Sequence, residues 1–270
     1  MRKITFEETK SIELNILKSV HDFCCKNRLT YYLTFGTLLG AVRHDGFIPW
    51  DDDIDIFMPR SDYERFISTF SFEGLKCLSL DHDKGYPFSY AKVIDLRTIK
   101  KEPIHLSKKI ELGVDIDIFP LDYYYEEGFD KRIYKKWHTY CRLWSLSVSK
   151  LRSKGVLKTI LLFPIKIALR PFYRIIARKI SYLTYNKEII DRNEKREPIG
   201  FVSAFCTSPA VWTYKIQWFE KTIFHKFESF DFLIPVGYDE LLRKVYGEYM
   251  SLPPVNKRIS HHLFEAYYKY

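Results

Sequence analysis

The sequence predicts an α+β fold in which helices flank a β-sheet. A helical pattern opens the chain, and a strand, a glycine turn, a short helix and a second strand follow between Tyr31 and Pro59. An apolar content of 46% in 270 residues supplies enough material for a folded core. A basic stretch with helical character, residues 131–200, predicts a helical insertion in this fold.

The first predicted element is a helix over residues 5–27. Thr5 and Glu8 have the spacing of a capping box, and Ile12, Ile16 and Val20 follow at helical spacing. We expect this helix to cover one face of the sheet.

The second element is the strand, turn, helix and strand unit. Tyr31 to Phe35 have the composition of a buried strand, and Gly36 ends that run. Thr37 is predicted to cap the short helix that follows. The chain then returns as a strand over Ile54–Met58.

Carboxylates are concentrated at the start of that returning strand. Because strand side chains alternate between faces, Asp53 and Asp55 point one way while Ile54 and Ile56 point into the core. Neighbouring carboxylates suit Mg²⁺ or Mn²⁺, and the helix start at Gly36 and Thr37 suits a phosphate. The residues alone also allow a solvated acidic turn. An EF-hand calcium loop starting at Asp51 is excluded, because the chain has Ile56 and Asp62 where that loop requires a glycine and a glutamate.

The later elements are predicted in the same way. Helices are expected over residues 60–70 and 238–249, and strands over residues 75–80, 89–96 and 201–205. A further strand is predicted over Ile110–Pro120, with Asp115 and Asp117 on one face. An amphipathic edge strand would show the same alternation. Lys92 falls in a strand pattern, either as an exposed lysine or as a cation facing phosphates.

Charge is distributed unevenly along the chain. The net charge is +9, yet residues 131–187 contain no Asp or Glu. This segment is consistent with a solvated helical face, with nucleic-acid binding, or with docking on an anionic membrane surface. No nucleic-acid motif supports the second reading, and we favour the third.

The five cysteines have no CxxC spacing, which favours reduced thiols. Neither a signal peptide nor a membrane span is apparent in the sequence.

Several segments together resemble a known family. The segment FGTLLGAVRHDGFIPWDDDIDIFMP at residues 35–59 is similar to the signature of the LicD family of phosphotransferases, which are related to the fukutins. Segments at residues 90–98, 113–122 and 237–254 fit the same family. The resemblance implies a nucleotidyltransferase-like core with a mixed β-sheet flanked by helices. We divide the chain into a catalytic core (1–130), a basic insertion (131–200) and a C-terminal part that completes the catalytic domain (201–270).

The resemblance also implies an activity. LicD enzymes move a phospho-alcohol, such as phosphocholine, from a CDP-linked donor to a sugar hydroxyl of a surface glycan and release CMP. The resemblance assigns Asp53, Asp55 and Asp117 to metal binding and catalysis, with Asp117 as a metal ligand or as the base for the incoming hydroxyl. Candidate substrate contacts are Gly36, Thr37, Arg43, His44, Trp50 and Lys92.

Other functions use similar carboxylates. A nucleotidyltransferase would attach the nucleoside monophosphate itself, and a glycosyltransferase with an Asp-x-Asp motif would release a nucleoside diphosphate. A non-catalytic scaffold at a membrane is the alternative of a different class. We expect Mg²⁺ or Mn²⁺ as the cofactor, a lipid-linked glycan as the acceptor, no nucleic-acid partner, and a cytoplasmic location at the inner face of the cell membrane.

Overall fold

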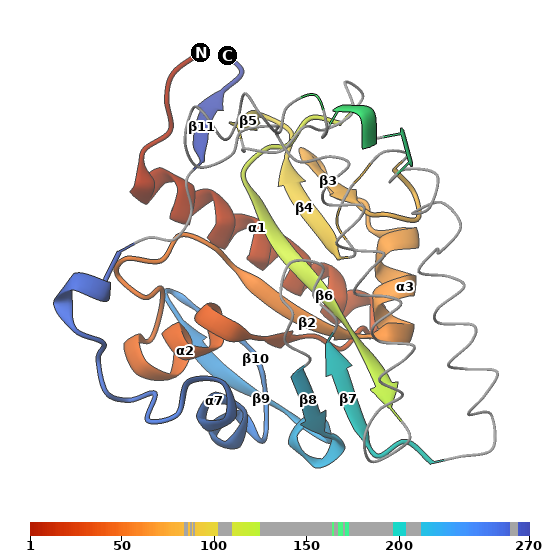
Figure 1. Ribbon diagram of the computed structural model, residues 1–270, viewed down its shortest axis with the longest axis vertical. Coiled ribbons are helices and arrows are strands. Elements are labelled where there is room, and N and C mark those ends of the chain that lie inside the picture. The colour runs from red at the N-terminus through yellow and green to blue at the C-terminus, as the bar shows by residue number, and fades with distance from the viewer. Residues whose placement is uncertain are drawn as a thin grey trace.

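A mixed sheet forms the centre of the protein (Figure 1). The computed structural model describes residues 1–83, 86, 88, 90–101, 110–124, 164, 167–169, 171–172, 197–203, 212–259 and 264–270. Within these residues the sheet has seven strands, with the order β1-β2-β6-β4-β3 and with β7 and β8 continuing from β6. Among the described strands of this sheet, only β2 and β6 run parallel, and the other pairs are antiparallel. The predicted combination of helices with a mixed sheet is therefore confirmed.

The elements have these bounds. The helices are α1 (Phe6–Asn27), α2 (Phe35–His44), α3 (Arg60–Thr69) and α7 (Tyr238–Tyr246), with 3₁₀ turns η1 (Ile216–Phe219) and η2 (Val255–Lys257). The strands are β1 (Tyr32–Leu33), β2 (Asp55–Pro59), β3 (Leu75–Leu78), β4 (Ala91–Asp95), β5 (Thr98–Lys101), β6 (Asp115–Tyr124), β7 (Gly200–Ser203), β8 (Trp212–Lys215), β9 (Thr222–Phe227), β10 (Phe230–Pro235) and β11 (Glu265–Tyr268).

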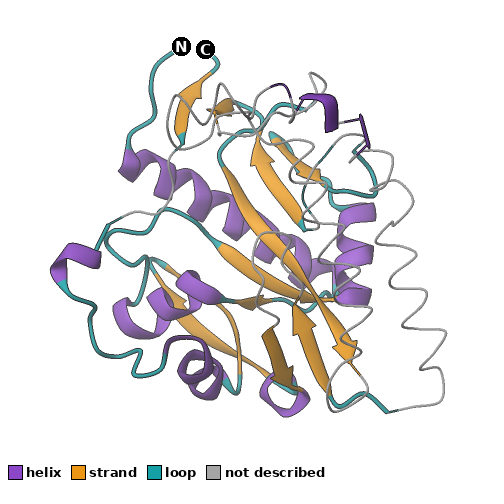
Figure 2. Ribbon diagram, viewed as in Figure 1, coloured by secondary structure: helices purple, strands orange, loops and turns teal. Residues whose placement is uncertain are grey.

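Helices cover both faces of the sheet, as Figure 2 shows by colour. On one face, α1 and α3 pack side by side, with the ring of Phe23 edge-on to that of Phe66 at 5.7 Å. On the other face, Phe35 at the start of α2 packs against Phe57 of β2 at 4.9 Å. The sheet therefore separates the long helix α1 from the short helix α2.

The predicted N-terminal helix is confirmed as α1. Thr5 Oγ1 accepts a hydrogen bond from the Glu8 N–H, and Glu8 Oε2 accepts one from the Thr5 N–H. Ile16 and Val20 of this helix are buried in the core. Local capping and periodicity agree here, which is why the sequence located the helix within one residue.

The predicted cap of the short helix is wrong. Helix α2 begins at Phe35, two residues before Thr37, and Thr34 stands at the cap position without a side-chain hydrogen bond. The hydroxyl of Thr37 instead accepts a hydrogen bond from the Asp55 N–H at 2.8 Å. This hydrogen bond joins two residues 18 positions apart in the sequence, and it takes the place of the predicted local cap.

The predicted bounds of the second carboxylate strand are also wrong. Strand β6 begins at Asp115 and continues past Pro120 to Tyr124. Pro120 is tolerated because pairing with β4 ends at Ile118 and pairing with β7 begins at Asp122. The N–H that Pro120 lacks is therefore not needed for pairing with β4 or with β7.

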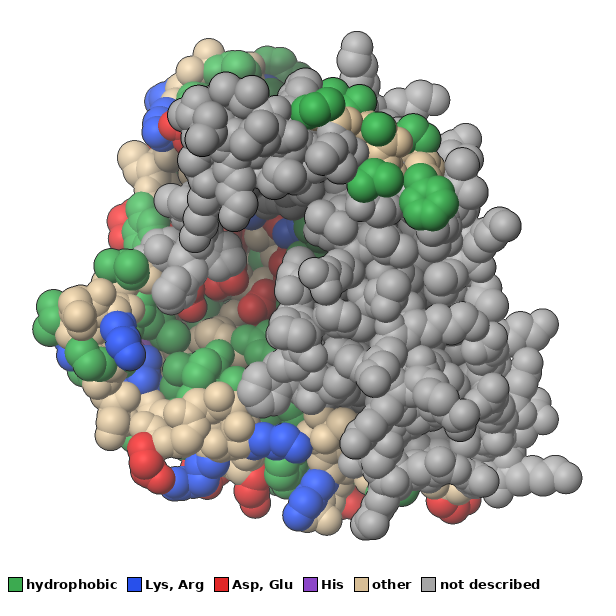
Figure 3. Space-filling model, viewed as in Figure 1, with side chains coloured by type: hydrophobic (Ala, Val, Ile, Leu, Met, Phe, Trp, Pro, Cys, Tyr) green, Lys and Arg blue, Asp and Glu red, His purple; other side chains and the backbone are tan. Residues whose placement is uncertain are grey.

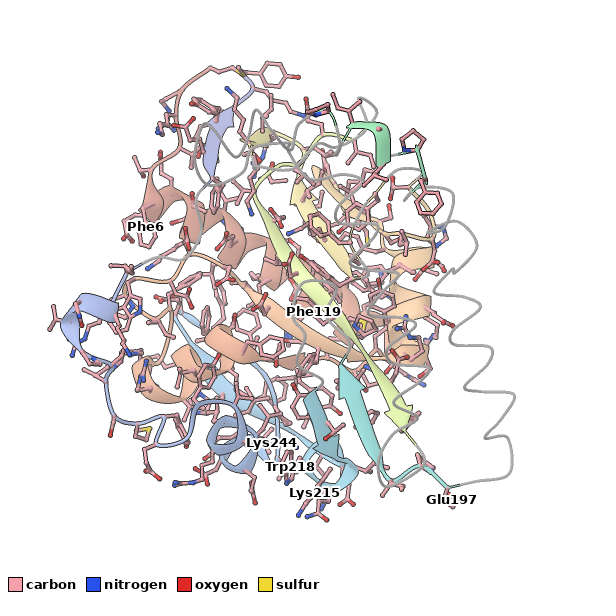
Figure 4. All side chains as sticks on the ribbon, viewed as in Figure 1. Phe6, Phe119, Glu197, Lys215, Trp218 and Lys244 are labelled. Atoms are coloured by element: carbon pink, nitrogen blue, oxygen red, sulfur yellow. The ribbon has the colours of Figure 1, made fainter. Side chains whose placement is uncertain are left out.

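The end of the chain packs onto the first half. The hairpin of β9 and β10 contacts β1 and α2, and β11 pairs with β5. Helix α7 packs on η1, where the ammonium of Lys244 lies 5.8 Å from the ring of Trp218 (Figure 4). These pairings join residues of the predicted C-terminal part to the predicted catalytic core. Most of the predicted insertion, residues 131–200, lies outside the described residues.

Candidate active site

Parallel pairing of β2 with β6 brings two carboxylates side by side. Asp55 is the register partner of Asp117, and Asp53 lies two residues before Asp55, just ahead of β2. Because side chains alternate along a strand, the three carboxylates share one face of the sheet. Ile54 and Ile56 point to the opposite face and are fully buried. The alternation expected from the sequence is confirmed at these positions.

Burial and mutual repulsion raise the pKa values of these acids. The pKa of Asp55 is raised well above its ordinary value by burial, and the charges of Asp53, Asp117 and Asp51 raise it further. Burial also raises the pKa of Asp117 to about 7, although Lys92 opposes the shift. The pKa of Asp51 rises to about 8 through burial and the neighbouring Asp53. A cation between these groups would relieve the repulsion.

Lys92 lies beside Asp117 on the neighbouring strand. It is the register partner of Asp117, and its ammonium is buried and donates to Asp117 Oδ1 at 2.5 Å and to Asp115 Oδ2. Lys100 Nζ lies 2.7 Å from the other oxygen of Asp115. Burial would raise the pKa of Asp115, but Lys100 and Lys92 outweigh it and lower this pKa to about 2. Lys92 is therefore shared between two carboxylates of β6.

The first turn of α2 lies against the same carboxylate face. Phe35 has φ 46° and packs its ring against Phe57 and, at 5.7 Å, against Phe119. A Cβ on Gly36 would lie 2.5 Å from Asp51 Oδ2, so a larger residue here would displace the Asp51 carboxylate. The first-turn N–H groups of a helix lack intrahelical acceptors, which makes this turn suited to an anion.

A cavity of about 760 Å³ opens between these elements and the segment after α7. Figure 3 shows acidic side chains gathered in a hollow on this face. One wall includes predicted site residues together with Asp51, namely Gly36, Arg43, Trp50, Asp51, Asp53 and Asp55. The opposite wall comes from residues between Tyr246 and Ile259. These residues form a second wall of the candidate active site, which no local sequence motif indicated.

The remaining predicted contacts lie around this cavity. Arg43 Nη1 donates to the carbonyl of Tyr249 at 2.7 Å, and Arg43 Nε donates to His44 Nε2 at 3.0 Å. Burial lowers the pKa of Arg43, and burial together with Arg43 lowers the pKa of His44. The ring of His44 is edge-on to that of Trp50 at 6.3 Å. Arg43 and Trp50 line the cavity, while His44 supports them from beside it.

The predicted metal ligands are close but do not form a complete ligand set. Among the described residues, no three Asp, Glu, His or Cys side chains converge closely enough to hold one ion. Asp53 and Asp55 border the cavity, whereas Asp117 is engaged by Lys92. The oxygen donors and their excess negative charge nevertheless fit a hard divalent cation.

Two residues of this network were not assigned roles by the sequence. Asp115 was visible in the alternating pattern before Asp117, but its buried pairing with Lys92 and Lys100 was not. Lys100 lies on β5, a strand that the sequence did not predict. Only the strand register brings these charges together.

Comparisons with known proteins identify relatives of the chain. Residues 28–151 match the family model described as "LicD/FKTN/FKRP, nucleotidyltransferase domain". The chain is 30% identical over 279 residues to the protein of Haemophilus influenzae named "Lipopolysaccharide cholinephosphotransferase LicD", covering 99% of each chain. Uncharacterised proteins of Rickettsia typhi (31% identical) and Rickettsia prowazekii (28%) match 47% of this chain and 40% and 47% of their own lengths.

Proposed function

The chain belongs to the LicD family and is a phosphotransferase of that family, and from this premise we propose that it transfers phosphocholine or a similar phospho-alcohol from a CDP-linked donor to a sugar hydroxyl of a lipopolysaccharide or related surface glycan. We also infer that its mixed sheet and helices form a nucleotidyltransferase-like core, as the description of the matching family model suggests.

The strand register is the observation that most strongly supports the proposed position of the reaction centre. Asp55 and Asp117 are in register on the two parallel strands, and the same face carries the first turn of α2. Acidic side chains and the start of α2 therefore border one cavity. Phosphoryl transfer depends mainly on positioning and on electrostatic stabilisation, and this arrangement can provide both.

We propose that Asp53, Asp55 and Asp117 hold Mg²⁺ or Mn²⁺. When bound, the ion would neutralise charge on the phosphate oxygens and lower the pKa of the acceptor hydroxyl. The raised pKa values of Asp55 and Asp117 support this proposal, because burial, and at Asp55 also the charges of Asp53 and Asp117, disfavours the ionised carboxylates without a cation.

The reaction that we propose is a direct substitution at phosphorus. The acceptor oxygen forms a bond to the phosphorus that carries the alcohol, and the bond from this phosphorus to the bridging oxygen breaks, so that CMP leaves. The proton of the acceptor hydroxyl goes to Asp117 where this residue acts as the base, and to water where it is a metal ligand. The first turn of α2 at Gly36 and Thr37 binds the pyrophosphate.

The other predicted contacts take supporting roles in this proposal. Arg43 and Trp50 line the cavity and contact the donor, and His44 orients Arg43. Lys92 was expected to face the phosphates, but its two carboxylate partners favour a role in orienting Asp117.

The location proposed for this enzyme is the inner face of the cell membrane. In the described part of the chain, no helix has the length and apolar character needed to cross a bilayer. We propose that the basic segment of residues 131–200 contacts anionic lipid, which would bring the enzyme to a lipid-linked acceptor. No nucleic-acid partner enters this proposal.

Mass spectrometry of the products tests the reaction. The protein is incubated with Mg²⁺, an acceptor glycan and CDP-choline labelled separately in the choline and in the cytidine. We expect the choline label and one phosphate in the glycan, with release of CMP. A cytidine label in the glycan would indicate a nucleotidyltransferase. Sugar transfer with release of a nucleoside diphosphate, in parallel reactions with nucleotide sugars, would indicate a glycosyltransferase.

A further inference from the structure

A short loop beside the cavity exposes an unusual density of apolar side chains. We call residues 250–259 the rim loop. Within it, Met250 is 58% exposed, Leu252 49%, Val255 76% and Ile259 58%. Single exposed apolar residues are common on protein surfaces, but here four of them fall within ten residues of one loop.

The fold presents these side chains outward from a supported loop. Pro253 and Pro254 lead into η2, and Arg258 Nε donates to the carbonyl of Pro253 at 2.9 Å. The guanidinium of Arg258 also lies 5.7 Å from the centre of the Trp50 ring. In Figure 1 the blue turn of η2 projects from the body of the molecule, next to α2.

The opposite side of the same loop borders the candidate active site. Ser251, Pro253, Asn256, Lys257 and Ile259 line the cavity that also contains Asp53 and Asp55. Met250, Leu252 and Val255 do not line it. One loop therefore forms part of the cavity wall and exposes apolar side chains beside the cavity.

The charge of the rim loop restricts the kind of partner. It contains the exposed Lys257 and the half-buried Arg258, which packs against Trp50, and no Asp or Glu. Figure 3 shows hydrophobic and basic side chains together on the projecting lobe. Apolar side chains flanked by basic ones are typical of segments that enter the interface of an anionic bilayer, with the cations at the lipid phosphates.

We propose that the rim loop inserts into the headgroup region of an anionic membrane and so holds the entrance of the active-site cavity at the bilayer surface. This inference rests on the proposed function, because a lipid-linked glycan would then reach the cavity without leaving the membrane. It differs from the contact proposed for residues 131–200 in its residues and in its position at the cavity.

Vesicle flotation without any acceptor tests the loop alone. The full chain is compared with the triple variant Met250→Ser, Leu252→Ser, Val255→Ser on vesicles of phosphatidylethanolamine with phosphatidylglycerol. The loss of three inserted side chains should lower the partition coefficient roughly 30-fold. Vesicles of phosphatidylcholine alone should bind the unaltered chain more weakly, because Lys257 and the basic segment of residues 131–200 then lack anionic partners. Phe224→Ser is the matched control, since Phe224 is 65% exposed on β9 and lies outside the rim loop.

Three results would overturn the inference: equal partitioning of the triple variant and the unaltered chain, an equal loss in the Phe224→Ser control, or an unaltered chain that stays unbound. Thermal melting of each variant checks that it is folded. Transfer to a water-soluble glycan should be unchanged in the triple variant, while transfer to a vesicle-anchored glycan should fall. If no chain acts on either glycan, the proposed function fails, and the flotation result still decides the role of the rim loop.

Discussion

Asp55 has opposite effects on stability and on catalysis. Its carboxylate lies among Asp53, Asp117 and Asp51, and burial together with these charges raises its pKa. Asp55→Asn should lower transfer at least about 1,000-fold, because a proposed metal ligand is lost. Without added metal, it should raise the free energy of unfolding by about 1 kcal/mol, because the repulsion is relieved. Activity assays and urea unfolding in chelator measure the two effects.

The matched control is Asp231→Asn, the same chemical change at an exposed position of β10. It should leave both activity and unfolding unchanged. A large loss of stability in Asp55→Asn would show instead that the carboxylate has a structural role.

The raised pKa values predict how metal binding depends on pH. Without metal, the pKa of Asp117 is about 7 and that of Asp51 is about 8. A metal binds the ionised carboxylate and displaces the proton, so the affinity for Mg²⁺ should increase between about pH 6 and pH 8 and then level off. Calorimetric titrations in two buffers of different ionisation enthalpy should detect proton release below about pH 8. Affinity that falls with rising pH would contradict the assignment.

The same shifts have a consequence for stability without metal. A carboxyl group whose folded pKa is raised binds more protons in the folded state than in the unfolded state. Its contribution is therefore fully present below the unfolded pKa and is lost as the pH rises through the folded value. The increase in melting temperature caused by Mg²⁺ should accordingly grow from acid to neutral pH.

At the scale of elements, the register of β4 on β6 defines the environment of Lys92. Lys92 pairs with Asp117 and also donates to Asp115, and all three side chains are largely buried. Lys92→Met should lower the free energy of unfolding by about 3 kcal/mol, because two buried carboxylates lose their shared cation. Asp117→Asn should reduce this cost, with a coupling energy of about 1–3 kcal/mol in a double-mutant cycle.

The control for Lys92 is Lys226→Met, at an exposed position of β9. It should change the stability little. If Lys92→Met leaves unfolding unchanged but raises the KM for the donor, Lys92 contacts substrate phosphate, as first expected from the sequence.

Elements specified by nearby residues were predictable, and those specified by distant partners were not. The capping box of Thr5 and Glu8 gave α1, and the alternation around Asp55 gave the faces of β2. The start of α2 was missed because Thr37 bonds to Asp55 instead of to its own helix. The start of β6 was missed because Leu112 and Val114 accept hydrogen bonds from Lys100 and Asp95 before the strand begins.

At the scale of the whole molecule, the site depends on contacts between distant parts of the chain. Arg43 donates to the carbonyl of Tyr249, and residues after α7 form one wall of the cavity. No local pattern could place this segment opposite Asp53 and Asp55, because its side chains show no period or motif for that role. The family resemblance included residues 237–254 but did not indicate where this segment lies in the folded protein.

The two ends of the chain illustrate this dependence and lie side by side in Figure 1. Strand β11 pairs with β5, and the Ile4 N–H donates to the carbonyl of Ala266 at 2.9 Å. Lys100 of β5 lies 4.3 Å from the ring of Phe264 and pairs with Asp115, which in turn pairs with Lys92 beside Asp117. The last strand is thus linked to the carboxylate site through buried charges.

Removal of residues 264–270 should therefore affect both stability and transfer. We expect the free energy of unfolding to fall by about 2–4 kcal/mol, because the only strand that pairs with β5 among the described residues is lost. Transfer should fall about tenfold, because Lys100 loses its packing and Asp115 and Lys92 are held less firmly. Urea unfolding and activity at saturating donor measure the two effects. Deletion of Tyr270 alone is the control, since this residue is fully exposed and should change neither. Full activity in the longer truncation, at unchanged stability, would show that the carboxylate site is independent of the chain ends.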